Sequence, residues 1–397
     1  MQAPSDDYRL TFEATSQTKP QYLALSEAHV RSPKRVERFV PSGLRDPANG
    51  ADYIFITHAD FITETQRLAD YRAAQGLRVK VVDVATLYDE FNDGIFHPVA
   101  IRNFLDYAYH NWQPPPPTYV LLVGDGHWNF KNHNPDKYGS PDPVFIPPYL
   151  AWVDPWQGEV GADHLFACVH GDDILPDMFI GRLAVNSPDQ AKVMVDKIIG
   201  YEAVPSACAD PWQRRILFVA DNADGIGDYP AVSDQIIARY LPPGYEALRV
   251  YLGVTHAEPD DVTQAIVESL NGGALLANYM GHGSVSRWAH EEIWVPEDIA
   301  SLDNGDRLPM VLTFNCLDGY FIYPGWSCIA EEMTRAEDKG SIVSWSPAGL
   351  GVIEVQQVLQ GAFYTAFFED GLHQVGAAAA AAKVALFGAL GENELIY

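Results

Sequence analysis

The sequence predicts an α/β protein with two side-by-side, mainly parallel sheets flanked by helices. Three observations lead to this fold class. Apolar runs typical of buried strands alternate with segments of helical periodicity. The alternation pauses after Pro205 and then starts a second time. With 397 residues the chain is also too long for one ordinary core, so two tightly packed halves are expected.

The expected division of the chain has three parts. Residues 1–50 are expected to be an irregular lead-in, the end of an upstream domain, with strands at 8–13 and 20–25. Residues 51–207 form the first α/β subdomain and residues 208–397 form the second. The chain ends on the apolar, strand-like run "LGENELIY", so we expect the second subdomain to be truncated at its C-terminus.

Each element of the first subdomain has its own signal. The predicted strands are 52–58, 78–84, 118–126 and 177–185, and the predicted helices are 61–76, 97–112 and 187–204. Gly76 closes the first helix, and Ser187 caps the third, which has Pro188 in its first turn. Residues 127–176 are rich in Asp, Pro, Gly and Trp and have little periodicity, which predicts a long excursion with short strands.

The second subdomain repeats the alternation. The predicted strands are 214–222, 245–253, 274–281, 309–315 and 341–346, and the predicted helices are 229–241, 258–273 and 327–340, followed by two final helices in "EVQQVLQGAFYTAFFEDG" and "QVGAAAAAAKVALFGALG". The runs 274–281 and 309–315 are apolar along almost their whole length, as the central strands of a parallel sheet are.

The charge balance excludes two classes of partner. The chain has 26 basic and 53 acidic residues, a formal charge of -27, so it would repel nucleic acid and anionic lipid. No apolar run approaches the roughly 18 residues that a membrane-spanning helix needs. Four cysteines are too few for a disulfide framework in a chain of this size. The sequence indicates no particular oligomeric state.

A histidine and a cysteine stand at the ends of the two predicted central strands. His282 follows strand 274–281 inside "GHG", and Cys316 follows strand 309–315. Reactive groups of parallel α/β sheets gather just beyond the C-terminal ends of strands, so the two side chains can face one cleft. An imidazole that takes the thiol proton would make Cys316 a nucleophile and His282 a general base.

Glycines flank the histidine. Gly281 and Gly283 remove side chains from around the ring, and we interpret them as leaving room for a polypeptide substrate to approach. The N–H groups of Gly283 and Cys316 are the expected oxyanion hole for a tetrahedral intermediate. On this interpretation, residues 208–397 are the catalytic subdomain.

Each of these residues also has a structural interpretation. A cysteine that ends a buried strand is often an apolar filler, and Gly-His-Gly also forms turns. Cys168, Cys208 and Cys328 are expected to be structural. His290 is followed by two glutamates, which suggests zinc, but no second histidine stands at the spacing of H-E-x-x-H.

The stretch "NYMGHGSVSRW" followed by "CLDGYF" resembles the catalytic region of the gingipain-type cysteine peptidases, which have the caspase-like fold. That family has a GHG histidine and then a cysteine in a C-x-x-G-x-F setting, matched here by Cys316, Gly319 and Phe321. "ADYIFITHADF", "YVLLVGDG" and "LPDMFIGRLAV" are similar to segments of its first subdomain. The resemblance covers about residues 50–390.

The resemblance implies a cysteine endopeptidase that hydrolyses peptide bonds through a thioester acyl-enzyme, with Cys316 as nucleophile and His282 as base. In this family an acidic residue in the loop after the first strand of the second subdomain orients the histidine. In "ADNADGIGD" Asp224 fits that role best, with Asp221 as a rival. The resemblance also implies a secreted or cell-surface protein.

Two further features of the family concern specificity and metals. Members that prefer a basic residue place a carboxylate at the base of the specificity pocket, and Asp228 and Asp234 are the candidates here. Members also bind calcium, and "VGDGHWNFKNHNPDKYGSPD" and "HGDDILPD" hold enough Asp and Asn oxygens for structural calcium. Polar surface loops are an equal alternative, so no metal ligand is assigned. The chemistry itself is expected to need no cofactor.

Three other functions stay open. A transpeptidase, like the sorting enzymes of this family, would use the same dyad to pass the acyl group to an amine. A non-catalytic α/β binding scaffold would keep both residues only as packing. A metal-dependent hydrolase could be built on "GDDILPD" and on "VGDGH", in which Asp125 stands between two glycines.

Overall fold

The computed structural model describes residue 30 and residues 38–133, 135–138, 143–203 and 210–392. Both sheets belong to one compact unit that runs from Pro41 to Tyr397. The strands predicted at 8–13 and 20–25, Cys208 and the predicted boundary between the subdomains lie outside the described residues.

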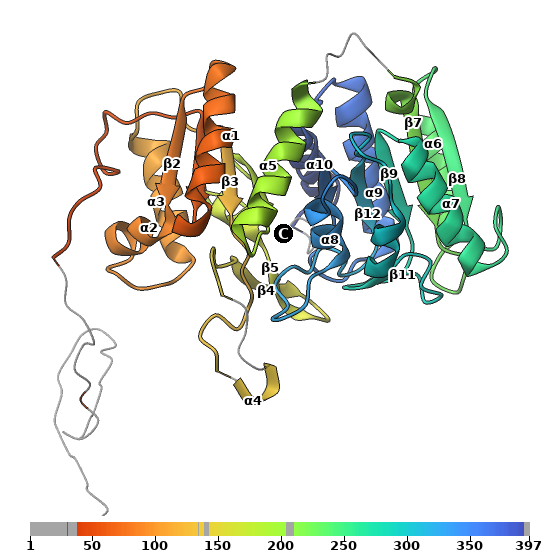
Figure 1. The fold of residues 1–397 in the computed structure, drawn as a ribbon, viewed down its shortest axis with the longest axis horizontal. Coiled ribbons are helices and arrows are strands. Elements are labelled where there is room, and N and C mark those ends of the chain that lie inside the picture. Colours follow the sequence, from red (N-terminus) through yellow and green to blue (C-terminus); the bar gives the residue numbers. More distant parts are fainter. Residues whose placement is uncertain (1–29, 31–37, 134, 139–142, 204–209, 393–397) are drawn as a thin grey trace, which may run out of the picture. The chain divides into compact units, whose positions relative to one another are not determined.

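The first sheet has four parallel strands in the order β2-β1-β3-β6 (Figure 1). Its strands are β1 (Tyr53–Thr57), β2 (Val79–Asp83), β3 (Tyr119–Val123) and β6 (Phe179–Leu183). Its helices are α1 (Ile62–Ala74), α2 (Val84–Phe91), α3 (Val99–Asn111) and α5 (Pro188–Ala203). Helices α2 and α3 pack on one face of this sheet, and α1 and α5 pack on the other.

Helix α2 was not predicted. It follows β2 without a loop, because Asp83 ends the strand and its side chain accepts the N–H of Ala85 at 3.0 Å as the N-cap. Residues 41–50 form turns against the same sheet. Leu44 is buried in this core, and its carbonyl accepts a hydrogen bond from Trp112 Nε1 at 2.9 Å.

The excursion between β3 and β6 contains short elements, as predicted. They are α4 (Pro135–Tyr138) and the antiparallel hairpin of β4 (Leu150–Asp154) and β5 (Gly158–Gly161). Val160 of β5 is buried against Tyr320 and Ile322, which follow Cys316 in the chain. The excursion therefore reaches from the first sheet to the second.

The second sheet has five parallel strands in the order β13-β12-β9-β7-β8. Its strands are β7 (Arg215–Ala220), β8 (Glu246–Tyr251), β9 (Leu276–Met280), β12 (Met310–Phe314) and β13 (Val343–Trp345). Every residue of β9 and β12 is buried, which confirms the two predicted central strands. A small hairpin of β10 (Gly283–Ser284) and β11 (Arg287–Trp288) follows β9.

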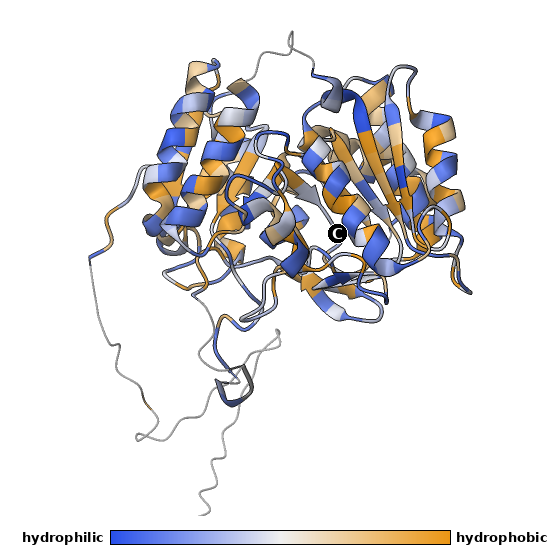
Figure 2. Ribbon diagram, turned by 45° about the vertical axis from the view of Figure 1, so that its right-hand side comes forward, coloured by the Kyte–Doolittle hydropathy of each residue, from blue (hydrophilic) through white to orange (hydrophobic). Residues whose placement is uncertain are grey.

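Helices cover both faces of the second sheet. They are α6 (Tyr229–Tyr240), α7 (Pro259–Gly272), α8 (Ile329–Arg335), α9 (Ile353–Tyr364) and α10 (Val375–Leu390). Helices α6, α9 and α10 pack on one face, and α7 and α8 pack on the other. Figure 2 shows the result, with hydrophobic colour on the strands and on the helix faces turned toward them.

Short 3-10 or π segments complete the chain at Ala59–Phe61, Asp163–Phe166, Pro211–Arg214, Pro296–Ser301 and Thr365–Glu369. Helix α8 is shorter than the predicted 327–340. It ends at Arg335 because the chain turns back, so that the N–H of Ser341 donates to the carbonyl of Met333 at 2.9 Å. Within the described parts of the chain, no helix is both long and apolar enough to cross a bilayer.

Helices α5 and α10 lie between the two sheets (Figure 1), where α5 contacts α8 and α10 contacts β6. A buried ionic cluster joins the sheets beside them. Arg335 at the end of α8 pairs with Asp125, just after β3, at 2.9 Å and with Glu331 at 2.6 Å. Its guanidinium also bonds the carbonyl of Ala184, just after β6. Burial and the charge of Asp125 raise the pKa of Glu331.

We expect Arg335→Met to lower the free energy of unfolding by about 3 kcal/mol, because it leaves the buried Glu331 carboxylate and the partly buried Asp125 carboxylate without their cation. Urea denaturation would measure the loss. The matched control is Arg67→Met, which removes an exposed arginine that also contacts two carboxylates and should cost less than about 1 kcal/mol. A similarly small loss for Arg335→Met would contradict the structural role of the cluster.

Candidate active site

The neighbouring strands β9 and β12 bring His282 and Cys316 to one edge of the second sheet. The strands pair in register, with Met280 opposite Phe314 as the last pair. His282 and Cys316 each stand two residues beyond that pair. Adjacent strands lie about 4.8 Å apart, so the two residues leave the sheet side by side, as the sequence predicted.

The His282 ring is held at one nitrogen. Its Nε2 lies 2.8 Å from Asp224 Oδ2 and 3.2 Å from the hydroxyl of Tyr229. Its Nδ1 has no hydrogen-bond partner among the described residues, so this nitrogen is free to contact another group. The carbonyl of His282 accepts the Tyr279 hydroxyl at 2.6 Å, which fixes the backbone beneath the ring.

Two acidic residues near the histidine have different roles. Asp224 contacts the ring and also accepts the N–H groups of Ile226 and Gly227 on Oδ1, at 2.7 and 3.0 Å. The hydrogen bond from His282 and these two N–H groups lower the pKa of Asp224 to about 2. Asp221 is buried and accepts the backbone N–H of His282 at 3.1 Å. Of the two candidates, Asp224 contacts the imidazole and Asp221 does not.

The Cys316 thiol is half-buried and contacts a loop after β13. Its Sγ accepts the N–H of Gly351 at 3.4 Å and shares no hydrogen bond with the His282 ring. Burial raises the pKa of the Cys316 thiol, with a smaller upward contribution from the charge of Asp154. The backbone N–H of Cys316 has no hydrogen-bond partner among the described residues. It is thus free to donate to another group.

Gly281 and Gly283, which flank His282, have a different structural role from the predicted one. A Cβ on Gly281 would lie 2.4 Å from Asp221 Cβ, and one on Gly283 would lie 2.3 Å from Asn315 Nδ2. The protein's own groups fill this space, so the prediction that both glycines clear room for a substrate was wrong. They are needed because the His282 hairpin packs directly against Asp221 and the segment that carries Cys316.

Sequence reasoning missed the buried residue that connects the loops of the site. Asp318, two residues after Cys316, is fully buried. It accepts Trp288 Nε1 of the His282 hairpin at 3.0 Å and the hydroxyl of Ser346, after β13, at 3.2 Å. Burial raises the pKa of Asp318 to about 6. An Asp two residues after a candidate nucleophile was a usable signal.

Tyr229 was also missed. It is the first residue of α6, directly after the acidic loop that carries Asp224, and the residue is buried. Burial and the nearby carboxylates raise the pKa of Tyr229 well above its ordinary value, so it stays a neutral phenol beside the His282 ring.

The two carboxylates suggested for a specificity pocket are engaged elsewhere. Asp228 caps α6 by accepting the N–H of Ala231 at 3.1 Å. Asp234 pairs with Arg249 at 2.8 Å and accepts the Tyr251 hydroxyl at 3.1 Å. Neither is free for a basic substrate side chain in this structure, so neither suggestion is supported.

Described residues of the two acidic runs suggested for calcium or for a metal-dependent hydrolase make other contacts in this structure. Asp125 is bound to Asn186 and Arg335, and Asp177 Oδ2 accepts the N–H groups of Val169 and His170. Across the described residues, no three His, Cys, Asp or Glu side chains converge in a way that could hold a metal ion. This includes His290 and the two glutamates that follow it.

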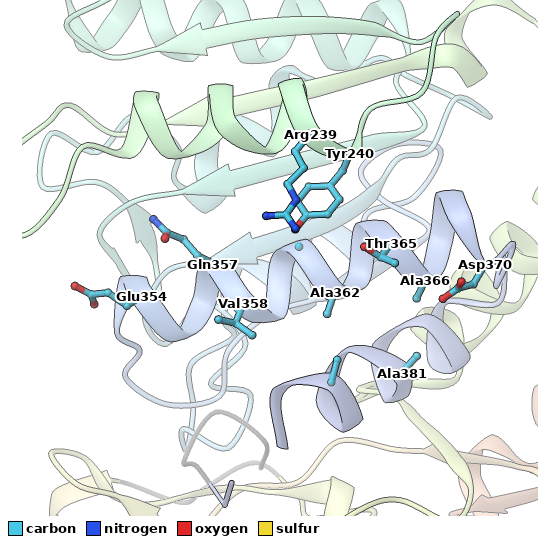
Figure 3. A pocket seen from close by; sticks show the side chains of 12 residues that line it. Arg239, Tyr240, Glu354, Gln357, Val358, Ala362, Thr365, Ala366, Asp370 and Ala381 are labelled. Atoms are coloured by element: carbon cyan, nitrogen blue, oxygen red, sulfur yellow. The ribbon is translucent and has the colours of Figure 1, made fainter. Parts of the chain in front are cut away.

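A cavity of about 490 Å³ lies away from these residues, among α6, α9 and α10 (Figure 3). Figure 3 shows Arg239 and Tyr240 extending from α6 toward α9, with Ala381 of α10 on the opposite side. His282, Cys316 and Asp224 are not among its lining residues. The cavity therefore does not belong to the candidate active site.

A known protein family matches most of this chain. The model of peptidase family C25 matches residues 46–395. The chain belongs to peptidase family C25. This confirms the resemblance to the gingipain-type cysteine peptidases that the two motifs around His282 and Cys316 indicated.

The relatives include Gingipain R2 of Porphyromonas gingivalis, 27% identical over 312 residues, which are 76% of this chain and 36% of that protein. Lys-gingipain of the same organism is 25% identical over 269 residues, 62% of this chain and 15% of that protein. The chain thus spans about a third or less of these curated relatives.

Solved structures share the fold. The crystal structure of the Arg-specific cysteine proteinase gingipain R superposes with a TM-score of 0.69 at 21% identity, and the match covers 90% of this chain and 77% of that one. A complex of the Porphyromonas gingivalis RgpB pro- and mature domains gives the same TM-score, over 87% and 76%. The predicted caspase-like fold is therefore confirmed.

We expect Asp318 to make stability depend on pH. Its folded-state pKa of about 6 lies above the ordinary value of 3.8, so its favourable contribution is full below 3.8 and is lost as pH rises through 6. Between pH 5 and 7.5, above the isoelectric point of about 4.6, the wild type should lose roughly 1 kcal/mol relative to Asp318→Asn. Urea denaturation across that range measures it, and parallel curves for the two proteins would disprove it.

We expect the resting thiol of Cys316 to be protonated at neutral pH, because burial raises its pKa above the ordinary value of 9.0. The rate of iodoacetamide labelling at Cys316, followed by mass spectrometry, should therefore rise with pH to a midpoint above 9. A midpoint below about 7 would instead indicate a thiolate already paired with an imidazolium in the free protein.

Proposed function

We propose that this chain is a cysteine endopeptidase in which Cys316 is the nucleophile, His282 the general base and Asp224 the residue that orients the base. The observation that carries the proposal is the arrangement at the ends of β9 and β12. A half-buried thiol and an imidazole with one free nitrogen leave adjacent strands at the same level. Membership of peptidase family C25 supports the same chemistry.

The reaction begins with proton transfer. His282 Nδ1 takes the thiol proton as Sγ attacks the carbonyl carbon of the scissile peptide bond. Asp224 bonds Nε2–H, which holds the ring in the tautomer with a free Nδ1 and stabilises the imidazolium that forms. The thiol has to turn from Gly351 toward the ring, a movement that substrate binding would favour because catalytic hydrogen bonds often tighten only in the complex.

The tetrahedral intermediate carries a negative oxygen. The N–H groups of Cys316 and Gly283 are the proposed donors to it, and the free N–H of Cys316 supports that role. When the C–N bond breaks, the imidazolium gives its proton to the leaving amine and a thioester remains on Cys316. Water, deprotonated by His282, then attacks the thioester, releases the acid product and restores the thiol.

The sequence of events is the same for a transpeptidase up to the thioester, at which an amine instead of water attacks. We retain hydrolysis as the proposal, and product analysis with an added amine would separate the two. Action on polypeptides outside the cell or at its surface belongs to the same proposal, by likeness to the gingipains. Structural calcium stays a prediction.

An acyloxymethylketone probe followed by peptide mass spectrometry tests the proposal. We expect labelling at Cys316, no labelling in Cys316→Ala, and a strong loss in His282→Ala. Turnover of a fluorogenic peptide should disappear in both variants and fall on the order of a hundred-fold in Asp224→Asn, because the ring loses its orienting carboxylate.

The matched control is His110→Ala, which removes an exposed histidine on α3 that contacts Asp106 and His170. Its turnover should equal that of the wild type. Equal, slow labelling of all cysteines in the wild type, unchanged in His282→Ala, would favour the non-catalytic scaffold and would refute the peptidase.

A further inference from the structure

The β4–β5 hairpin of the excursion reaches the loop beside Cys316 through one carboxylate. Asp154, the last residue of β4, is 5% exposed. Its Oδ1 accepts the N–H groups of Trp156 at 2.8 Å and Gln157 at 2.7 Å, which closes the hairpin turn. Its Oδ2 accepts the N–H of Leu350 at 2.5 Å, across 196 positions of the chain. The carboxylate thus joins the first sheet's excursion to a loop of the second sheet.

The loop of residues 349–351 is held between this carboxylate and the nucleophile. On one side, the N–H of Leu317 donates to the carbonyl of Gly349 at 2.9 Å, and the N–H of Gly351 donates to Cys316 Sγ at 3.4 Å. On the other side, a Cβ on Gly349 would lie 2.6 Å from Asp154 Oδ2. The contacts with Leu317 and with Asp154 therefore fix the position in which the Gly351 N–H meets the Cys316 sulfur.

We propose that Asp154 is a positioning residue for the nucleophile: it holds Leu350 so that the N–H of Gly351 meets the Cys316 sulfur, and it places a negative charge beside the thiol. This inference rests on the proposed function and adds a residue of the first sheet to the site. A carboxylate that accepts three N–H groups in a buried position is rigid, which suits a positioning role.

The charge of Asp154 has its own consequence. A negative charge beside a thiol disfavours the thiolate, so the proton stays on Cys316 until His282 takes it. The other titratable groups described at this end of the sheet are the His282 ring, Tyr229 beside it, and the carboxyl groups of Asp221, Asp224 and Asp318. The charge of Asp154 contributes to the raised pKa of the Cys316 thiol.

Asp154→Asn separates the contact of this side chain with the hairpin turn from its contact with Leu350. The amide oxygen can keep the two N–H groups of the hairpin turn, but its NH₂ group cannot accept the N–H of Leu350. We expect kcat to fall about ten-fold or more with KM within about two-fold, because the contact acts on the nucleophile and not on bound substrate. The pH midpoint of iodoacetamide labelling at Cys316 should move down by at least about half a unit, because the charge is gone.

Asp154→Glu keeps the charge and changes the reach by one methylene. It should lower kcat but leave the labelling midpoint at its wild-type value. The matched control is Asp177→Asn in the same excursion, whose carboxylate also accepts two backbone N–H groups, those of Val169 and His170. It should change neither kcat nor the midpoint.

Wild-type kcat and midpoint in Asp154→Asn would overturn the proposal, as would a loss of thermal stability with no shift of the midpoint. If Asp154→Asn does not fold, Gly349→Ala carries the test, because its Cβ pushes the loop off Asp154. It should lower kcat in the folded protein, and wild-type kcat would overturn the proposal. Should the wild type hydrolyse no peptide, the proposed function fails, while the labelling midpoint still reports on Asp154.

Discussion

The in-register pairing of β9 with β12 is the constraint on which the whole site depends. Both strands are buried on both faces, and their last pair, Met280 and Phe314, sets the level at which the chain leaves the sheet. A slip of one residue would turn every side chain of a strand to the opposite face of the sheet, which the packed core on each face forbids. Core packing therefore places His282 beside Cys316 without any direct bond between them.

The loops that follow four neighbouring strands then give the site its chemistry. Asp224 comes after β7, His282 after β9, Cys316 after β12 and Gly351 after β13. The carboxylates around them behave differently because their surroundings differ. Asp224 is partly exposed and receives hydrogen bonds that favour its charge, whereas Asp318 is sealed in the core and resists ionisation. One residue type thus supplies both a charged partner for the His282 imidazole and a buried connector of loops.

Much of the fold was predictable because its signals are local. Strand and helix periodicity indicated both parallel sheets, and their order placed the candidate base and nucleophile at strand ends. Helix α2 was missed because it begins where β2 ends, with Asp83 serving as both the last strand residue and the cap. The interpretation of Gly281 and Gly283 failed because a glycine in a sequence does not show which atoms occupy the space of its missing side chain.

The amino-acid sequence alone was sufficient for the α/β class, the two central strands, the family resemblance and the pair His282 and Cys316, because periodicity and short motifs are properties of neighbouring residues. Only the folded chain shows that Asp224, and not Asp221, contacts the His282 imidazole. Only there does Asp234 form an ion pair with Arg249. Folding also brought Asp154 to Leu350 from far along the chain. Such contacts form between residues distant in sequence, so they depend on how loops from both sheets meet, which no local pattern encodes.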